Sequence, residues 1–110
     1  MSSDALLVLT NLPDPQSAAH LAEKLVGERL AACVNILAPC ASVYRWRGEV
    51  ETAQETPLLI KTLRSQYGKL EETIRAGHPY ELPEIIAVPI EAGLPAYLAW
   101  IAAETGTTEI

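Results

Sequence analysis

The chain has 110 residues, of which 49% are hydrophobic and 20% charged, and its formal net charge is −6 at pH 7. This length suits one domain with its own core, and we expect a single domain over residues 1–110. The acidic charge disfavours nucleic acid and anionic membranes as partners, because both are bound through basic surfaces. The chain opens with neither a signal peptide nor a long apolar run, so we expect a cytoplasmic protein with no membrane partner.

The first part of the chain predicts a strand followed by an amphipathic helix. Residues 5–12 are apolar and strand-like, and Pro13 ends them. Asp14 is a good N-cap and Pro15 suits the first helical position. Apolar residues of the helix recur at helical spacing and form one face: Ala18, Leu21, Ala22, Leu25, Val26 and Leu30. His20 lies off that face.

The middle of the chain predicts a long β-hairpin. Residues 33–46 are rich in β-branched and aromatic side chains and lead through a two-residue turn into residues 49–63. Thirteen residues of the first arm would span about 43 Å, whereas a compact domain of this length is roughly 34 Å across. The hairpin therefore has to bend or project. Pro39 and Pro57 are the expected bend or bulge points, because proline cannot donate to a strand ladder.

The two cysteines lie in the first arm of this hairpin. Cys33 and Cys40 would be about 23 Å apart in one extended strand, whereas the Cα atoms of a disulfide lie within about 7 Å of each other. We expect no bridge between them, which fits a reducing compartment. Cys33 is expected to be a small buried hydrophobe, and Cys40, on a bend, the more exposed thiol.

A second helix and a strand follow the hairpin. Ser65 is the expected cap of the helix, in which Tyr67, Leu70 and Ile74 share one face, and Gly77 is placed to end it in a left-handed conformation.

The last segment predicts a buried strand at residues 85–90 and a helix opened by Gly93-Leu94-Pro95. The tail from Thr105 is expected to fray. The apolar residues of this helix are expected to pack inward: Tyr97, Leu98 and Ile101.

The order of these elements is β, α, β, β, α, β with an added C-terminal helix, which is the ferredoxin-like plan of an α+β protein. Its antiparallel sheet carries both helices on one face, so the other face is left bare. A ligand, the C-terminal helix or another copy of the chain would have to cover it. We favour oligomerisation, because a projecting two-stranded ribbon is marginal in water unless another chain pairs with it.

The candidate site is the segment of residues 78–84, which combines an imidazole, a phenol and two carboxylates on a turn stiffened by two prolines. His78 is a candidate metal ligand, with Glu81 and Glu84 as oxygen partners and Cys33 as a soft ligand from another segment. The other interpretation, which we favour, is that His78 ends the second helix and hydrogen-bonds locally.

The sequence also predicts a cleft at a subunit boundary. Tyr44 and Trp46 share one face of the hairpin, where they can stack on a ligand or, as we favour, pack against a neighbouring subunit. Lys61 lies in an otherwise apolar strand, so we expect it to pair with Glu81 or Glu84. The expected cleft or ligand-binding residues are Lys61, Trp46 and Tyr80.

Four sequence blocks occur together in the chain: ERLAACVN at residues 28–35, YRWRG at 44–48, IKT at 60–62 and HPYELPEI at 78–85. In this order and at this spacing they closely resemble the CutA family of divalent-cation tolerance proteins, over nearly the whole chain. The resemblance implies a ferredoxin-like protomer in a tight homotrimer, with strands pairing between subunits and an architecture related to the PII signalling proteins. It also implies tolerance to copper and other divalent metals, without catalytic activity.

The copper ligands of the family carry over only in part. Copper-binding bacterial relatives have a cysteine near the end of the first strand and two adjacent histidines before the proline. This sequence has Thr10 at the first position and Gly77-His78 at the pair, so only His78 remains. Cys40 also departs from the pattern, which usually has a small residue there.

These observations leave two functional hypotheses. The first is a trimeric divalent-cation tolerance protein that binds copper or another divalent cation weakly in response to metal stress and needs no cofactor to fold. The second is a PII-like small-molecule sensor or adaptor that acts through a cleft between subunits. We do not expect an enzyme, because the sequence has no phosphate-binding loop, metalloprotease motif or nucleophile elbow.

Overall fold

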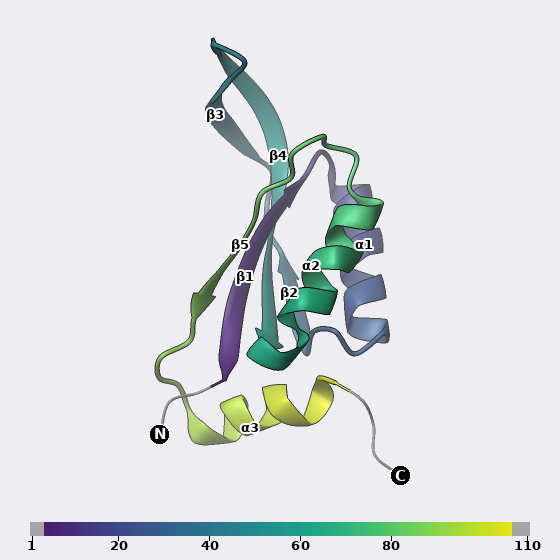
Figure 1. Cartoon of the computed structure of the whole chain (residues 1–110), viewed down its shortest axis with the longest axis vertical. Coiled ribbons are helices and arrows are strands. Elements are labelled where there is room, and N and C mark those ends of the chain that lie inside the picture. The colour runs from purple at the N-terminus through teal and green to yellow at the C-terminus, as the bar shows by residue number, and fades with distance from the viewer. Residues whose placement is uncertain (1–3, 107–110) are drawn as a thin grey trace.

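The fold is a mixed α/β arrangement of an antiparallel sheet and three α-helices, described over residues 4–106 of a computed structural model (Figure 1). The order of strands and helices is the predicted one, except that the first arm of the hairpin is divided into two strands. In chain order the elements are β1 (Ala5–Leu12), α1 (Pro15–Gly27), β2 (Cys33–Ile36), β3 (Cys40–Trp46), β4 (Glu49–Leu63), a short 3₁₀ helix (Arg64–Gln66), α2 (Tyr67–Gly77), β5 (Ile85–Pro89) and α3 (Pro95–Glu104).

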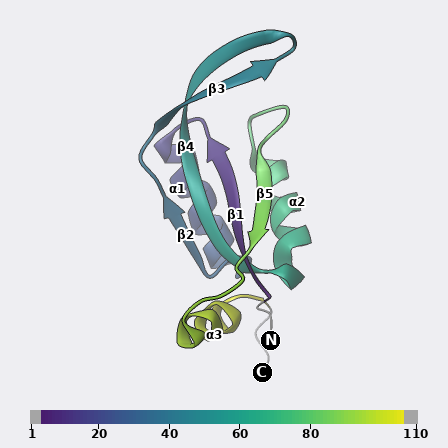
Figure 2. The same cartoon turned by 90° about the vertical axis from the view of Figure 1, so that its left-hand side faces the viewer.

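The sheet has the strand order β2-β4-β1-β5, and β3 pairs with the outer part of β4. All of these pairs are antiparallel. Helices α1 and α2 lie side by side over one face, and α3 lies across the end of the sheet where β1 begins and β4 ends (Figures 1 and 2). Most of the opposite face is left uncovered by the described elements, as the sequence predicts, and α3 packs on it only at the end, around Ala5 and Leu63.

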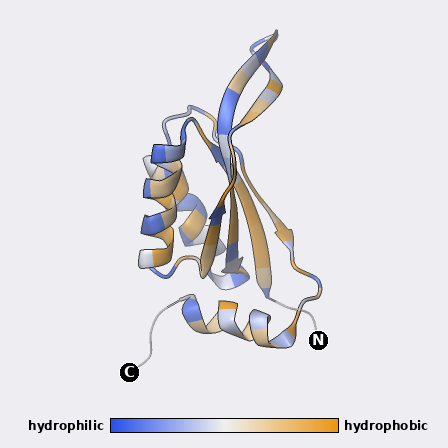
Figure 3. Ribbon diagram, turned by 180° about the vertical axis from the view of Figure 1, so that it is seen from behind, coloured by the Kyte–Doolittle hydropathy of each residue, from blue (hydrophilic) through white to orange (hydrophobic). Residues whose placement is uncertain are grey.

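The core lies between the sheet and the two helices that cover it. Alternate residues of β1 and of the inner part of β4 point toward the helices, and this part of the sheet is largely apolar (Figure 3). The central buried residues of this core are Val8, Leu12, Leu21, Leu25, Leu58, Ile60, Leu70 and Ile74. Because burial of one such side chain contributes about 1.5–3 kcal/mol, this layer supplies most of the fold's stabilisation.

The uncovered side of the sheet, which we call the open face, carries an apolar patch formed by residues of β1, β4 and β5. Leu9 lies opposite both Leu59 and Ile86 in the ladder, and Leu7 lies opposite Val88. Ile86 and Val88 are 52% and 45% exposed. Apolar side chains gathered in this way on one surface are typical of an interaction site.

The hairpin of β3 and β4 projects beyond the rest of the molecule and curves (Figures 1 and 2). The described chain measures 49 × 27 × 23 Å, so the prediction that the hairpin bends or projects is confirmed. At the turn, Arg47 and Gly48 both have positive φ, 52° and 84°. Two left-handed residues match the right-handed twist of the strands that they join.

The first arm is interrupted at Pro39, as expected, and the register shows how. Ile36 lies opposite Leu58 and Cys40 lies opposite Glu55, so three residues, 37–39, face only two, 56–57. The extra residue makes a bulge, which bends the strand. Pro57 does not insert a bulge: it stays in register opposite Asn11, and its carbonyl accepts from the Leu37 N–H at 3.0 Å.

Helix α1 begins as predicted and ends earlier. Asp14 is the N-cap, and its Oδ1 accepts from the Ser17 N–H at 2.7 Å. The helix ends at Gly27, so Leu30 lies beyond it, although Leu30 is still buried, and Val26 is exposed.

Two predictions about α2 are wrong. Ser65 lies within the 3₁₀ helix and does not cap α2, whose N-cap is Gln66. Gly77 is not left-handed, because the described glycines with positive φ are Gly48 and Gly106. The last helical residue is Gly77, and the C-cap is His78. The backbone of His78 is extended (φ −88°, ψ 135°) because the following proline disfavours helical conformation.

Helix α3 buries less than predicted. Ile101 is buried and Leu98 packs beside it, but Tyr97 is 41% exposed, and its ring lies 5.5 Å from that of Trp100. The helix crosses the end of the sheet, so only one narrow side of it meets the core. No helix of the described part is long and apolar enough to span a membrane.

The two described residues after α3, Thr105 and Gly106, pack against the rest of the protein and are not frayed. Thr105 is buried, and the Gly106 N–H donates to the Arg29 carbonyl at 2.7 Å. The rest of the predicted tail lies outside the described residues.

Candidate functional site

His78 is half-buried at the end of α2, and both of its ring nitrogens have partners. Nε2 lies 2.7 Å from the carbonyl oxygen of Asn11, and Nδ1 lies 3.1 Å from the backbone nitrogen of Tyr80. A backbone N–H can only donate, so Nδ1 accepts and Nε2 carries the proton donated to Asn11. The imidazole therefore ties the end of α2 to the end of β1. A metal ion could reach Nδ1 only by displacing the Tyr80 N–H.

The two carboxylates of the turn also have partners. Glu81 Oε1 lies 2.8 Å from Arg47 Nη2, and both side chains are mostly exposed. Glu84 Oε1 accepts from Asn11 Nδ2 at 3.0 Å. Glu81 thus links the turn to the hairpin through an exposed ion pair, and Glu84 links it to β1 through a hydrogen bond. In residues 4–106, no group of three or more His, Cys, Asp or Glu side chains is arranged to hold a metal ion.

Lys61 does not pair with Glu81 or Glu84, contrary to the sequence prediction. Its Nζ hydrogen-bonds to Asn35 Oδ1 and lies 3.9 Å from Cys33 Sγ. These three residues share the open face because β2 lies beside β4 with Cys33 opposite Lys61. In β1, Leu7 is opposite Lys61 and Asn11 is four residues farther along, about 13 Å away. Lys61 and Cys33 therefore occupy a different part of the protomer from His78.

Both cysteines are free thiols, as expected. Cys33 is half-buried rather than fully buried, and Cys40 is exposed. Burial raises the pKa of the Tyr97 hydroxyl, and a side-chain hydrogen bond with Cys33 adds to the shift, so α3 lies close to this thiol.

Thr10, at the position of the family's cysteine, cannot reach a surface metal. It is fully buried on the side of β1 that faces the helices, and its hydroxyl has no hydrogen-bond partner among the described residues. Asn11, the next residue, points to the opposite side because side chains alternate along a strand. Thr10 is therefore a core residue in this fold.

Trp46 and Tyr80, by contrast, lie together. They line a concave space of about 810 Å³ between the β3–β4 hairpin and the turn at residues 79–84, which we call the hairpin cleft. Its walls combine aromatic rings, carboxylates and small or apolar side chains: Asn11, Ser42, Val43, Tyr44, Trp46, Glu51, Ala53, Glu55, Pro79, Tyr80, Glu81, Leu82 and Glu84.

Two glutamates of the hairpin cleft were missed by the sequence reasoning. Glu51 lies directly opposite Tyr44 in the ladder, and Glu55 is on the same face of β4 two positions beyond Ala53. The period-two pattern Glu51, Ala53, Glu55 was a usable signal, because it places both carboxylates on the face that carries the aromatic side chains.

The tyrosines of the hairpin cleft lie close enough to these glutamates to be affected by their charge. Burial raises the pKa of Tyr80 to about 12, and the charge and hydrogen bond of Glu55 add to this shift. Burial also raises the pKa of Tyr44, with Glu51 contributing in the same way. Each phenol therefore keeps its proton to higher pH than an ordinary tyrosine does.

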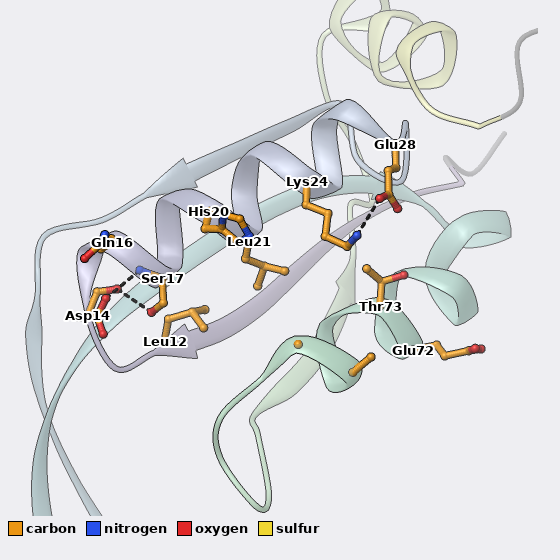
Figure 4. A pocket seen from close by; sticks show the side chains of 12 residues that line it. Leu12, Asp14, Gln16, Ser17, His20, Leu21, Lys24, Glu28, Glu72 and Thr73 are labelled. Atoms are coloured by element: carbon orange, nitrogen blue, oxygen red, sulfur yellow. Dashed lines mark hydrogen bonds and ion pairs between the residues drawn. The ribbon is translucent and has the colours of Figure 1, made fainter.

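A second cavity of about 920 Å³ lies between α1 and α2 (Figure 4). Its polar groups serve the helices themselves. Asp14 caps α1 through Ser17, and Lys24 pairs with Glu28 at 2.8 Å, one turn farther along the helix. His20, the other histidine of the chain, lines it without meeting His78.

Comparison with known proteins identifies the family. The sequence model described as CutA1 divalent ion tolerance protein matches residues 6–104. The chain belongs to the CutA1 family. The match confirms the resemblance seen in the four sequence blocks, and it covers every described helix and strand except the first residue of β1.

Individual CutA proteins are similar over the same span. The divalent-cation tolerance protein CutA of Thermus thermophilus is 48% identical over 100 residues, which are 91% of this chain and 97% of that protein. The crystal structure of CutA from Xylella fastidiosa has a TM-score of 0.91 at 47% identity and covers 94% of this chain and 100% of its own. CutA1 from Oryza sativa has a TM-score of 0.92 at 38% identity, covering 97% and 98%. The mixed α/β fold with its antiparallel sheet is therefore that of CutA1 structures.

Proposed function

We propose that this chain is the protomer of a trimeric divalent-cation tolerance protein that binds copper or another divalent cation weakly in response to metal stress. The observation that carries the proposal is the CutA1 family match over residues 6–104. The protomer would be a ferredoxin-like βαββαβ unit with an added helix, in a PII-like trimer. We further propose that it works in the cytoplasm and catalyses no reaction.

Two features of the protomer support the trimer. The open face exposes apolar side chains on β5, and the hairpin projects with Val50 exposed at 64%. Both surfaces would be buried if strands and faces of neighbouring subunits met, and burial of apolar area drives association.

The proposed metal site would lie between subunits. One protomer brings His78, Glu81 and Glu84 to one turn, which offers one nitrogen and two carboxylates, each already hydrogen-bonded. A borderline metal usually has three or four protein ligands, so a neighbouring subunit would complete the set, with Cys33 as a soft donor from that subunit. Exchange of existing hydrogen bonds for metal ligands is the physical reason to expect weak affinity.

Calorimetric titration of the metal-free protein with copper tests this site, and the chain offers a matched control in its second histidine. We expect His78→Ala to abolish specific copper binding and His20→Ala to leave it unchanged. His78→Ala also removes two hydrogen bonds, so the free energy of unfolding should fall by about 1–3 kcal/mol while the protein still folds. Unchanged copper affinity in His78→Ala would contradict the proposed ligand set.

The second candidate function is a PII-like small-molecule sensor or adaptor, and the hairpin cleft favours it. Its volume of about 810 Å³ lies within the range of roughly 300–1,000 Å³ typical of small-molecule sites, and its walls are aromatic and polar. Titration with a panel of anionic, neutral and cationic metabolites tests this function. Saturable binding of a metabolite in the absence of metal would support it, and a panel without any binding would oppose it.

A further inference from the structure

The hairpin cleft carries aromatic rings and carboxylates in the combination that recognises organic ammonium groups. We propose that it binds a small organic cation, an amine or a quaternary ammonium compound. This inference rests on the second candidate function, the sensor or adaptor, and names the chemical class of its ligand.

The aromatic part of the cleft comes from both of its walls. Tyr44 and Trp46 stand on β3, and Tyr80 stands on the opposite turn. The faces of such rings attract ammonium and guanidinium groups within about 6 Å, more strongly as water is removed. A ligand between the two walls would therefore lie beside aromatic residues of both.

The chain itself shows this chemistry at the rim of the cleft. The guanidinium carbon of Arg47 lies 5.2 Å from the centre of the Trp46 ring, and the same side chain pairs with Glu81 at 2.8 Å. An organic cation is thus already held there by one ring and one carboxylate. Both members of that ion pair are about 70% exposed, so the pair is weak and a ligand can replace it.

Two carboxylates on the β4 side of the cleft have no cation of their own. Glu51 lies opposite Tyr44 in the ladder, Glu55 follows it on the same face of β4, and neither makes an ion pair within residues 4–106. Two negative charges thus line a concave space, where an electrostatic attraction is screened less than at an open surface.

A bare divalent metal ion fits the cleft less well than an organic cation. Hard cations need several oxygen ligands that converge at about 2.0–2.6 Å, and the described residues contain no such group of three. The cleft volume is also far larger than an ion requires. A compact ammonium group with carbon substituents would use the rings and the charges together.

Calorimetric titration of the full-length protein, in its native oligomeric state, provides the test. The probes are choline and its uncharged isostere dimethylbutanol, in which carbon replaces the quaternary nitrogen. We expect choline to bind with a Kd below about 1 mM and the isostere to bind at least about tenfold more weakly. Glu55→Gln should weaken choline binding about tenfold, and Tyr80→Phe, which keeps the ring, should weaken it less.

Glu72→Gln is the matched control, because it makes the same change in the cavity between α1 and α2. It should leave choline binding unchanged. The proposal is overturned if the isostere binds as well as choline, if Glu55→Gln and Glu51→Gln bind choline normally, or if choline does not bind.

The same titration with succinate and glucose separates this inference from the sensor function. Suppose that succinate or glucose binds, that Tyr80→Ala abolishes this binding, and that choline does not bind. The cation proposal is then wrong, and the proposal that the cleft binds a ligand stands. If no probe of any class binds, both the cation proposal and the sensor function are contradicted.

Discussion

Polar side chains of residues 78–84 are used for hydrogen bonds within the fold. The His78 imidazole uses one nitrogen to accept from Tyr80 and the other to donate to Asn11, and Glu84 bonds to the side chain of the same Asn11. These contacts hold the turn against the end of β1. The same turn carries Tyr80, which lines the hairpin cleft. His78 therefore helps to position one wall of that cleft whether or not it binds metal.

Tyr80 predicts a specific pH dependence of stability. Its pKa is about 12 in the folded protein, whereas the ordinary pKa of a tyrosine is 10.0. As pH rises above about 10, the unfolded chain loses this proton first, so unfolding becomes more favourable. The contribution of Tyr80 is therefore fully present below about pH 10 and is lost as pH rises through about 12.

Urea unfolding at a series of alkaline pH values measures this effect, and Tyr80→Phe isolates it from the other tyrosines. The stability of the wild-type protein should fall more steeply than that of Tyr80→Phe between about pH 10 and 12. In Glu55→Gln the phenol should titrate at lower pH, as followed by its ultraviolet absorbance. Parallel curves for the wild type and Tyr80→Phe would show that the cleft does not perturb this group.

At the scale of elements, α3 is held by one arginine. Arg29 has a left-handed backbone (φ 60°), and its guanidinium donates to the carbonyls of Ala103 at 2.8 Å and Gly106 at 2.7 Å. The Arg29 carbonyl also accepts from the Gly106 N–H. The bond to Ala103 satisfies a carbonyl that the end of the helix leaves without a partner, and the bonds to Gly106 hold the chain just beyond it. They fix α3 across the end of the sheet, where it buries only a narrow side.

We expect Arg29→Lys to loosen α3 without unfolding the protein, because lysine keeps the charge but lacks the planar fork that meets two carbonyls. Amide hydrogen exchange in residues 95–104 should accelerate about tenfold or more, whereas exchange in α2 should not change. Arg45→Ala on the projecting hairpin is the control for loss of an exposed cation. Unchanged protection of α3 in Arg29→Lys would mean that Ile101 alone anchors the helix.

At the scale of the whole molecule, the uncovered sheet face and the projecting hairpin leave apolar surface that one protomer cannot bury. The proposed trimer would bury it, and an assembly held in this way should resist salt, because apolar burial is not screened. Ile86 is the sharpest probe, since it is exposed and lies opposite Leu9 at the centre of the open face.

We expect the wild-type protein to sediment as a trimer at micromolar concentration and Ile86→Lys to sediment as a monomer, because a lysine there would have to lose its hydration to enter the interface. Val26→Lys is the matched control: Val26 is similarly exposed, but it lies on α1, away from the open face. A wild-type monomer would oppose the trimer. A trimeric Ile86→Lys would place the interface elsewhere.

The sequence by itself determined the features that depend on neighbouring residues. Asp14 and Pro15 started α1, the Arg47-Gly48 turn closed the hairpin, and Pro39 interrupted its first arm. These outcomes follow from local hydrogen bonding and backbone sterics, which a few residues fix alone. The order of the predicted strands and helices likewise predicted a sheet with one covered face. The four family blocks predicted the family, and of the expected cleft residues the structure brings Trp46 and Tyr80 together but not Lys61.

Only the tertiary structure decided which distant side chains meet. Lys61 contacts Asn35 and Cys33 rather than a glutamate, because the strand beside it on the open face is β2 and the 78–84 turn lies elsewhere. Glu55 met Tyr80 because the bent hairpin brings β4 against that turn. Such contacts depend on strand register and on the direction of a bend, and a shift of one residue moves every side chain to the other face. Composition and local pattern carry no information about that choice, so the site could be assembled only once the fold was known.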